Sequence, residues 1–434
     1  MGESTFLSSF FDRLSEARIV YAVLRNADKL PESLDGSDLD ILVRHEDFAA
    51  VACVISELTA SHGGHVIVRR KAGAFCQFML LGHDGLEWWG VCVDLFDGVT
   101  WRGFLPVCAQ DAIAYRVKNA KGIWTFDDET AHLIGFAKEW LVNGRVSRRY
   151  ESLACAAIGT DKSGVLTPVI ADAVGKLLKG ANVSVVRFRM LQIIRCALSH
   201  PITFCKYFIG FQIGKVFRFL KPGGAMVAVL GTDGSGKSTL LNVISPVLNQ
   251  TVHNQLKIHH LRPDLLPPLG RLRGVKYKPG YVCTTPHKSR PSGVVGSFLR
   301  IVYLTLDYAL GYWIKVRPHL AKIPTGSWIF DRYAYDMILD PLRFRIKLPN
   351  RIISFFANLV PKPDLILCLG GDPEKIYARK PETSLDEVRR QVAELKKFCD
   401  GNRRAVWVDT TMSVDESKNA ALKAITESMS KRYN

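Results

Sequence analysis

The chain has 434 residues, of which 47% are hydrophobic and 23% are charged, a balance that is typical of a globular protein with two or three domains and excludes a disordered chain. Its ten cysteines form no C-x-x-C pair and no cluster with zinc-ligand spacing, which argues against a disulfide-rich secreted protein and favours a cytoplasmic one. The net charge of +17 comes from two segments, 173–232 and 257–300, so we expect two local basic surfaces.

The N-terminal segment predicts an α+β domain, which we assign to residues 1–104. Residues 1–18 place Phe6, Phe10 and Leu14 on one side of a helix and show no signal-peptide pattern. The apolar runs that follow predict two strands, a helix and three more strands, at residues 19–24, 39–43, 46–58, 65–68, 75–81 and 87–95.

Two carboxylates follow a Gly-Ser turn at residues 36–40. Because side chains alternate along a strand, Asp38 and Asp40 share one face, where they can bind Mg²⁺ for nucleotidyl transfer. The spacing resembles that of the polymerase-β-type nucleotidyltransferase superfamily, whose third carboxylate lies on a later strand. Asp94 fits that position, with Asp97 as the alternative. The resemblance therefore implies a metal site formed by Asp38, Asp40 and Asp94; the alternative is a domain that keeps the fold and binds a ligand or partner without catalysis.

Residues 105–221 predict a mostly helical connector, with one clear helix at 129–141. Near it, Lys138 and the pair Arg148–Arg149 are candidates to contact a triphosphate, although such cations more often form a solvated helix face. From 173 to 232 there is no acidic residue, and Lys and Arg alternate with aromatic side chains. Peripheral membrane contact through 173–221 is one interpretation of this segment. A buried pair of helices with snorkelling cations is the other.

The sequence Gly-Thr-Asp-Gly-Ser-Gly-Lys-Ser-Thr at 231–239 follows the apolar strand 225–230 and precedes the helix-compatible segment 240–247. A strand, a glycine-rich turn and a helix are the context in which the pattern G-x-x-x-x-G-K-[ST] binds nucleotide phosphates. Lys237 can reach the β- and γ-phosphates, and the Ser238 hydroxyl can ligate Mg²⁺. The predicted ATP-binding residues are Gly231, Thr232, Asp233, Gly234, Ser235, Gly236, Lys237, Ser238 and Thr239.

Beyond this loop, short apolar strands at 328–330, 364–369 and 405–408 alternate with helical segments. Such alternation predicts a parallel α/β sheet covered by helices on both faces, which we assign to residues 222–434. The basic segment 261–292 is rich in proline and glycine and predicts a long irregular excursion over the strand tips, where ligands bind in such sheets.

The motif Asp331-Arg332-Tyr333 ends one of these strands. Together with the loop at 231–239, the strand 363–367 and the segment 377–380, it resembles the thymidylate kinase group of nucleoside-monophosphate kinases over roughly residues 225 to 430. The resemblance implies a Mg²⁺-ATP phosphotransferase in which Lys237, Asp331, Arg332 and the lid residue Arg379 are catalytic and Ser238 and Asp331 hold Mg²⁺. Thr410 would lie near the adenine. The residues implied in acceptor binding are Asp233, Arg262 and Arg300.

The residues after Tyr333 depart from the thymidylate kinase pattern. Where that family has a serine and an Ala-Tyr-Gln segment that read the thymine ring, this chain has Asp336 and Leu339-Asp340-Pro341. Losing the groups that recognise a base weakens the case for thymidylate as acceptor. The segment 335–345 resembles instead a branch of thymidylate-kinase-like proteins from bacterial surface-polysaccharide gene neighbourhoods.

These features lead us to expect an α/β phosphotransferase that transfers the γ-phosphate of ATP to a small phosphorylated acceptor, coupled to N-terminal nucleotidyl transfer. One alternative is a sugar or sugar-phosphate kinase and nucleotidyltransferase in surface glycan synthesis. Another is a non-catalytic, regulatory ATP-binding protein. No nucleic-acid-binding motif stands out, so nucleic acid is not an expected partner. A homodimer and peripheral attachment at the inner membrane face are further hypotheses.

Overall fold

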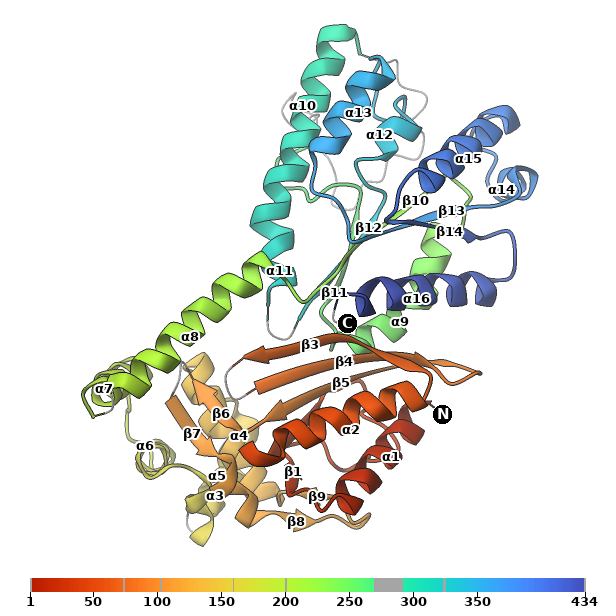
Figure 1. Cartoon of the computed structure of the whole chain (residues 1–434). Coiled ribbons are helices and arrows are strands. Elements are labelled where there is room, and N and C mark those ends of the chain that lie inside the picture. The colour runs from red at the N-terminus through yellow and green to blue at the C-terminus, as the bar shows by residue number, and fades with distance from the viewer. Residues whose placement is uncertain are drawn as a thin grey trace. The chain divides into compact units, whose positions relative to one another are not determined.

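The computed structural model describes residues 2–72, 75–101, 104–158, 160–199, 201–268, 292–322 and 325–432. Most of the predicted excursion at 261–292, with the cations from Arg271 to Arg290, lies outside the described residues. The chain forms two compact units, residues 2–217 and 218–432, each with its own sheet and core (Figure 1). The predicted mixed α/β class is confirmed. Residues 105–217 belong to the first unit by their contacts, and the division into three domains stays a prediction.

The first unit begins with a helix and is built around a mixed sheet. Its strands are β1 (Tyr21–Val23), β2 (Leu39–Val43), β3 (Gly64–Ala72), β4 (Phe75–His83), β5 (Trp88–Phe96), β6 (Gly98–Trp101), β7 (Phe104–Cys108), β8 (Val117–Lys118) and β9 (Trp124–Thr125). Its helices are α1 (Gly2–Glu16), α2 (Phe48–Ser61), α3 (Ala109–Ala112), α4 (Asp128–Asn143), α5 (Glu151–Ile158), α6 (Pro168–Leu178), α7 (Val185–Ser199) and α8 (Pro201–Leu220), the last of which runs into the second unit.

The seven-stranded sheet of this unit has the order β3-β4-β5-β2-β1-β9-β8. Apolar side chains of α1 and α2, such as Phe6, Phe10 and Ile55, form one core with the sheet. A second core, centred on Leu133 and Trp140 of α4, joins β1 and β2 to α4, α5 and α6. The strands β8 and β9 come from beyond the predicted α+β segment; each has two residues, too few for a period-two pattern to show.

The second unit alternates strands and helices. Its strands are β10 (Met226–Gly231), β11 (Leu256–His260), β12 (Ser327–Asp331), β13 (Leu365–Gly370) and β14 (Ala405–Asp409). Its helices are α9 (Lys237–Thr251), α10 (Val294–Gly311), α11 (Arg317–Leu320), α12 (Asp336–Leu339), α13 (Asn350–Leu359), α14 (Pro373–Arg379), α15 (Leu385–Asp400) and α16 (Val414–Ser430), with a π-helical turn, Tyr312–Val316, between α10 and α11.

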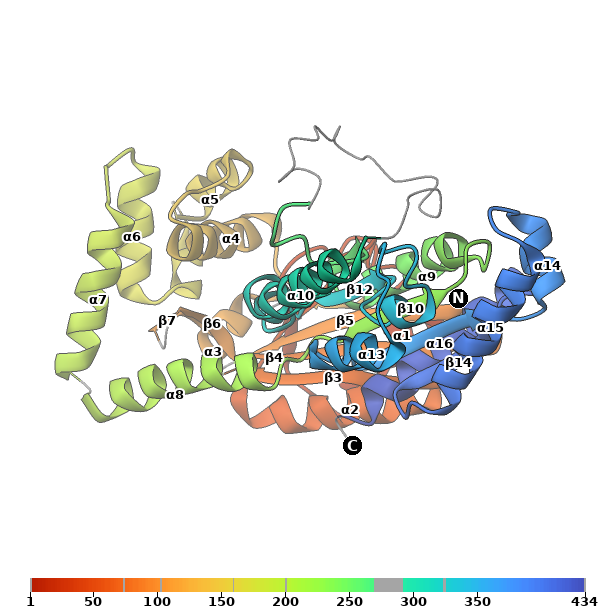
Figure 2. The same ribbon diagram turned by 90° about the horizontal axis from the view of Figure 1, so that it is seen from above.

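All strand pairs in the five-stranded sheet of this unit are parallel, in the order β11-β12-β10-β13-β14. Helices α10, α13 and α15 cover one face and α9 and α16 the other; α10 and α13 lie side by side, with Phe298 packed on Phe356 (Figures 1 and 2). The three predicted strands and the strand before the loop are confirmed. Since carboxyl ends of parallel strands meet at one edge, β10 and β12 bring the loop at 231–239 beside Asp331.

One continuous helical segment among the described residues, Val294–Leu320, is long and apolar enough by length and composition to cross a membrane. Core helices of soluble proteins meet the same criterion. Here Asp307 in the middle of α10 is fully buried and forms an ion pair with Arg262, with Arg262 Nη1 3.2 Å from Asp307 Oδ2. The contact ties α10 to the segment that follows β11.

Candidate functional site

The glycine-rich loop connects the end of β10 to the start of α9. Gly234 (φ +84°) and Gly236 (φ +77°) adopt the left-handed conformation, which other residues adopt only with strain. A Cβ atom at Gly234 would lie 2.7 Å from the carbonyl oxygen of Ile376 and 3.2 Å from Cβ of Lys380. The end of α14 therefore packs directly on the loop.

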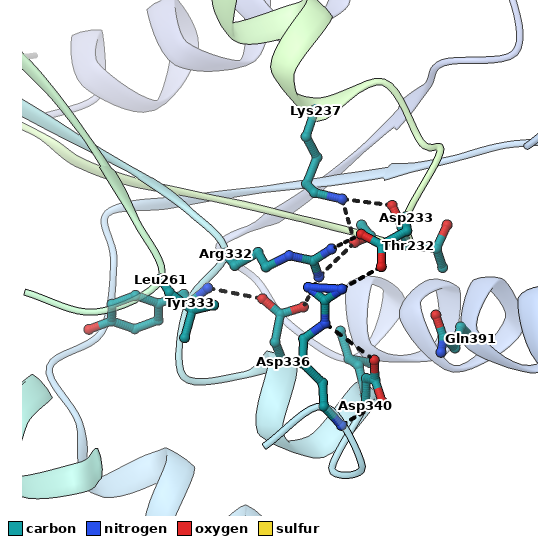
Figure 3. Close-up of polar contacts among 12 residues, drawn as sticks. Thr232, Asp233, Lys237, Leu261, Arg332, Tyr333, Asp336, Asp340 and Gln391 are labelled. Atoms are coloured by element: carbon teal, nitrogen blue, oxygen red, sulfur yellow. Dashed lines mark hydrogen bonds and ion pairs between the residues drawn. The ribbon is translucent and has the colours of Figure 1, made fainter. Parts of the chain in front are cut away.

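The side chain of Lys237 folds back across the loop. Its Nζ donates hydrogen bonds to the carbonyl oxygens of Gly231 (2.9 Å) and Thr232 (2.7 Å), as Figure 3 shows for the Thr232 contact. Burial, followed by the neighbouring positive charge of Arg332, lowers the pKa of Lys237 to about 7. Lys237 is thus an easily deprotonated group beside the loop, where added negative charge would raise its pKa and restore its full positive charge.

Arg332 follows β12 directly and is 4% exposed. It has a positive φ of 75°, a backbone conformation that is costly for a non-glycine residue and is concentrated at functional sites. Its guanidinium forms an ion pair with Asp233 of the loop and lies 3.5 Å from Oδ1 of Asp336 (Figure 3). The strained backbone therefore directs a buried cation at the phosphate-binding loop.

Asp331, the last residue of β12, interacts with the last residue of the neighbouring strand. Nδ1 of His260 at the end of β11 lies 3.0 Å from Oδ2 of Asp331. Burial would raise the pKa of Asp331, but the hydrogen bond from His260 and the charge of Lys237 outweigh burial and lower it. Asp331 is therefore held as a carboxylate.

Asp233 and Asp340 are linked by a second arginine, Arg343, which the sequence reasoning did not select. Its guanidinium pairs with Asp233, and its backbone N–H donates to Oδ1 of Asp340 at 3.2 Å. Burial would raise the pKa of Asp233, but Arg332 and Arg343 on either side lower it. Asp336, 2% exposed, accepts the N–H of Tyr333 at 3.0 Å, and burial raises its pKa in spite of Arg332. The positions that depart from the thymidylate kinase pattern thus build a network of alternating charges.

Several polar atoms at the loop lack hydrogen-bond partners. Within the described residues, Oγ1 of Thr232, Oγ of Ser235 and Oδ1 of Asp331 are buried and make no hydrogen bond. Unsatisfied buried polar atoms are costly and often mark a ligand site. With Ser238 and Thr239 exposed in the first turn of α9, these donors and acceptors fit a Mg²⁺-bound triphosphate.

The other residues predicted to bind the acceptor or to form the lid are Arg262, Arg300 and Arg379. Arg262 is 9% exposed and engaged by two carboxylates, at 2.9 Å from Asp264 and 3.2 Å from Asp307. Arg300 is half-buried on α10. Arg379, at the end of α14, donates from Nη1 to the carbonyl oxygen of Thr410 at 2.8 Å. Arg379 is thus held at the end of β14, beside the residue that the resemblance places near the adenine.

A second cluster lies on the sheet of the first unit. Asp40 on β2 is the register partner of Asp94 on β5, and one carboxylate oxygen from each of Asp38, Asp40 and Asp94 lies within 4.8 Å of the others. All three side chains are buried. Asp97, the alternative third carboxylate, lies beyond the end of β5 beside His45. The structure thus brings together the three carboxylates that the resemblance selects, and the metal role stays a prediction.

The environment of this cluster fits a cation. Burial and then the charges of Asp40 and Asp38 raise the pKa of Asp94 to about 8. Arg25 donates from Nη2 to Asp38 at 3.0 Å and from Nε to Asp40, and the buried amide of Gln77 donates to Asp94 at 3.0 Å. Three crowded buried carboxylates repel one another, and a divalent cation relieves that repulsion.

Among the candidate triphosphate contacts, Lys138 acts electrostatically on Asp40 and its Nζ lies 5.4 Å from the centre of the Phe96 ring. Arg148 is exposed, and the side chain of Arg149 lies outside the described residues. The sequence reasoning missed Arg25, Gln77, His260 and Arg343 as site residues. Each of them reaches its carboxylate partner only through the fold, and no sequence motif marks these contacts.

Comparisons with known proteins give structural similarity only. No family model and no curated protein matches the chain. Among solved structures, the chain is similar to the thymidylate kinase from Ehrlichia chaffeensis, at 15% identity over 46% of this chain and 98% of that one, with a TM-score of 0.32. It is also similar to the thymidylate kinase from Candida albicans, at 20% identity over 46% of this chain and 91% of that one, with a TM-score of 0.34.

Proposed function

We propose that the second unit is an ATP-dependent phosphotransferase of the thymidylate-kinase-like type that acts on a small acceptor. The observation that carries the proposal is the convergence of Lys237, Asp331 and Arg332 at the glycine-rich loop, from the adjoining ends of two parallel strands. A protein that merely binds ATP has no need of a strained, buried arginine beside the loop.

The groups at the glycine-rich loop would each have a separate role in phosphate transfer. The loop N–H groups and the start of α9 would hold the phosphates, and Lys237 would transfer its hydrogen bonds from the carbonyl oxygens of Gly231 and Thr232 to phosphate oxygens. Arg332 would stabilise charge that develops on the transferring phosphoryl group. Asp331 and the Ser238 hydroxyl would hold Mg²⁺, which supplies charge neutralisation between the β- and γ-phosphates when bound.

The resemblance implies a nucleoside monophosphate as the acceptor. One observation favours instead a hydroxyl-rich acceptor such as a sugar or sugar phosphate. Asp336 and Asp340 stand where a thymidylate kinase reads the base, and each is paired with an arginine in a charge network. Carboxylates accept hydrogen bonds from hydroxyl groups, whereas apolar base faces gain little from such surroundings.

The experiment is acceptor-dependent ADP release by the full-length chain with Mg²⁺-ATP and a panel of nucleoside monophosphates, free sugars and sugar phosphates. We expect release with at least one acceptor, and its loss in Lys237→Ala and Arg332→Ala. Lys322→Ala removes an exposed lysine of the same unit and serves as the control. ATP binding that depends on Lys237, without release for any acceptor, would favour a non-catalytic ATP-binding protein instead.

A second candidate activity, nucleotidyl transfer in the first unit, is favoured by the clustered carboxylates Asp38, Asp40 and Asp94. Together the two activities would phosphorylate and then nucleotidylate one metabolite. The test is product analysis with mixed nucleoside triphosphates for the Asp38→Ala/Asp40→Ala variant, with Asp35→Ala as a control because Asp35 is an exposed carboxylate of the same segment. Unchanged products in the double variant would contradict nucleotidyl transfer.

A further inference from the structure

Helix α7 is fixed on the first unit by its inner side. The ring of Phe188 packs on Trp140 of α4 with centroids 4.9 Å apart, and the guanidinium of Arg189 donates to the carbonyl oxygen of Leu141. Gln192, one turn further along, is 8% exposed. These contacts fix which side of α7 faces outward.

The outward side of α7 is apolar. Val186, Met190, Ile194 and Leu198 recur every four residues and so form one stripe along the helix, with Leu191 beside them; each is between 51% and 78% exposed. The remaining residues of this side include two exposed arginines, Arg187 and Arg195. The outward side of a helix in a water-soluble unit is normally polar, so we expect another surface to cover this apolar side of α7.

Helix α8 continues the same pattern. Ile202, Ile209, Ile213 and Val216 are spaced for one side of a helix and are 48% to 86% exposed. Further round the helix, Nζ of the exposed Lys215 lies 4.5 Å from the centre of the Phe211 ring. The last turn is held in the second unit, where Arg317 donates from Nε to the carbonyl oxygen of Phe219 at 2.6 Å.

The charge of these helices has one sign. Segment 173–232 contains no acidic residue, and across the described ranges Arg187, Arg195 and Lys215 form no ion pair with a carboxylate. Cations among exposed apolar side chains complement a surface that offers anionic groups above an apolar layer. A second copy of the same surface would instead oppose positive charge to positive charge.

We propose that the outward side of α7 and the exposed apolar side of α8, here called the α7–α8 surface, dock the protein on a membrane that carries anionic phospholipids. The apolar stripes insert among the acyl chains near the headgroups, while Arg187, Arg195 and Lys215 contact phosphate groups. Neither helix is long and apolar enough to cross a membrane, which suits binding in the plane of the interface.

The test is co-flotation of the full-length chain with vesicles of phosphatidylcholine alone or with about 30% phosphatidylglycerol, at about 50 mM and about 500 mM NaCl. The charge variant is Arg187→Gln/Arg195→Gln/Lys215→Gln, and the apolar variant is Met190→Ser/Ile194→Ser/Leu198→Ser. The control, Lys375→Gln/Lys397→Gln/Lys423→Gln, removes the same charge from exposed positions on α14, α15 and α16. Since all of the substituted positions are exposed, melting temperatures should match the wild type.

We expect binding to the anionic vesicles that falls at high salt. Each cation near the surface contributes about fivefold, so the charge variant should lose about 100-fold in partition coefficient at low salt. The apolar variant should lose more than about tenfold at both salt concentrations, and the control should bind like the wild type. The proposal is overturned if anionic and neutral vesicles bind equally, or if either test variant binds like the wild type. Light scattering that shows a wild-type oligomer dissociated by both test variants, with no vesicle binding, would assign the surface to a protein contact and also overturn it.

Discussion

Nδ1 of His260 lies 3.0 Å from Oδ2 of Asp331, so the last side chains of two adjacent parallel strands interact at the edge of the sheet that carries the glycine-rich loop. His260 holds the carboxylate that we propose for Mg²⁺, and the hydrogen bond helps to keep its pKa low. Groups that orient a metal-holding carboxylate commonly matter almost as much as the carboxylate itself.

We therefore expect His260→Ala to lower phosphotransfer about 10- to 100-fold at limiting Mg²⁺, with part of the loss restored by high Mg²⁺. The neighbouring His259→Ala is the matched control, because the His259 ring packs on Trp328 rather than on Asp331. Equal losses in both variants would show that His260 has only a structural role.

Lys237 should make nucleotide binding depend on pH. Its pKa is lowered to about 7, and bound triphosphate should raise it, so binding above pH 7 takes up a proton. The affinity for ATP should be constant well below pH 7 and fall by up to about tenfold per pH unit above it. Calorimetry at pH 8 in two buffers of different ionisation enthalpy measures the uptake directly. Identical heats in both buffers, or an affinity that rises with pH, would contradict this assignment.

Variants of Arg262 can distinguish a structural role of this residue from a role in acceptor binding. Its partner Asp307 is 0% exposed, so Arg262→Met should lower the free energy of unfolding by about 3–5 kcal/mol by leaving a buried charge without its cation. The double variant Arg262→Met/Asp307→Leu should recover most of that stability. If its activity also recovers, Arg262 is structural; if a stable double variant has a strongly raised KM for the acceptor alone, Arg262 binds the acceptor.

The carboxylate cluster in the first unit should limit stability. The pKa of Asp94 is raised to about 8, so the folded state prefers the protonated form and loses stability as pH rises from about 4 to 8. Asp94→Asn should therefore stabilise the protein by about 1–3 kcal/mol at pH 8 in metal-free buffer, and change it little at pH 4. Thermal unfolding with and without Mn²⁺ checks the metal role, because the cation should stabilise the wild type and not the variant. Asp35→Asn is the control, and an equal response to Mn²⁺ in wild type and Asp94→Asn would contradict a site there.

The sequence allowed prediction of those features that depend on local patterns. The loop at 231–239 is a sequence motif, and the strand before it and the alternation of strands and helices are patterns of apolar residues. The structure has strands at the predicted positions. The period of two places Asp38 and Asp40 on one face, and the resemblance to the nucleotidyltransferase superfamily added Asp94 as the third carboxylate. The parallel register of β2 and β5 then aligns Asp40 with Asp94.

Contacts between distant segments could not be predicted in the same way. His260 reaches Asp331 across 71 residues, and Arg343 reaches Asp233 across 110 residues, from a turn with no sequence pattern of its own. From the sequence, α7 and α8 could be either a membrane-facing or a buried pair of helices. In the structure, the packing of Phe188 and Arg189 on α4 and the burial of Gln192 identify the outward side of α7.

The close packing of α14 on Gly234 has a mechanical consequence. With the Ile376 carbonyl oxygen 2.7 Å from where a Cβ at position 234 would lie, there is no slack between this helix and the loop. The same helix ends at Arg379, which is bonded to Thr410. Helix α14 therefore contacts both the phosphate-binding turn and, through Arg379, the residue that the resemblance places near the adenine. A displacement of Arg379 would be transmitted to the turn through α14.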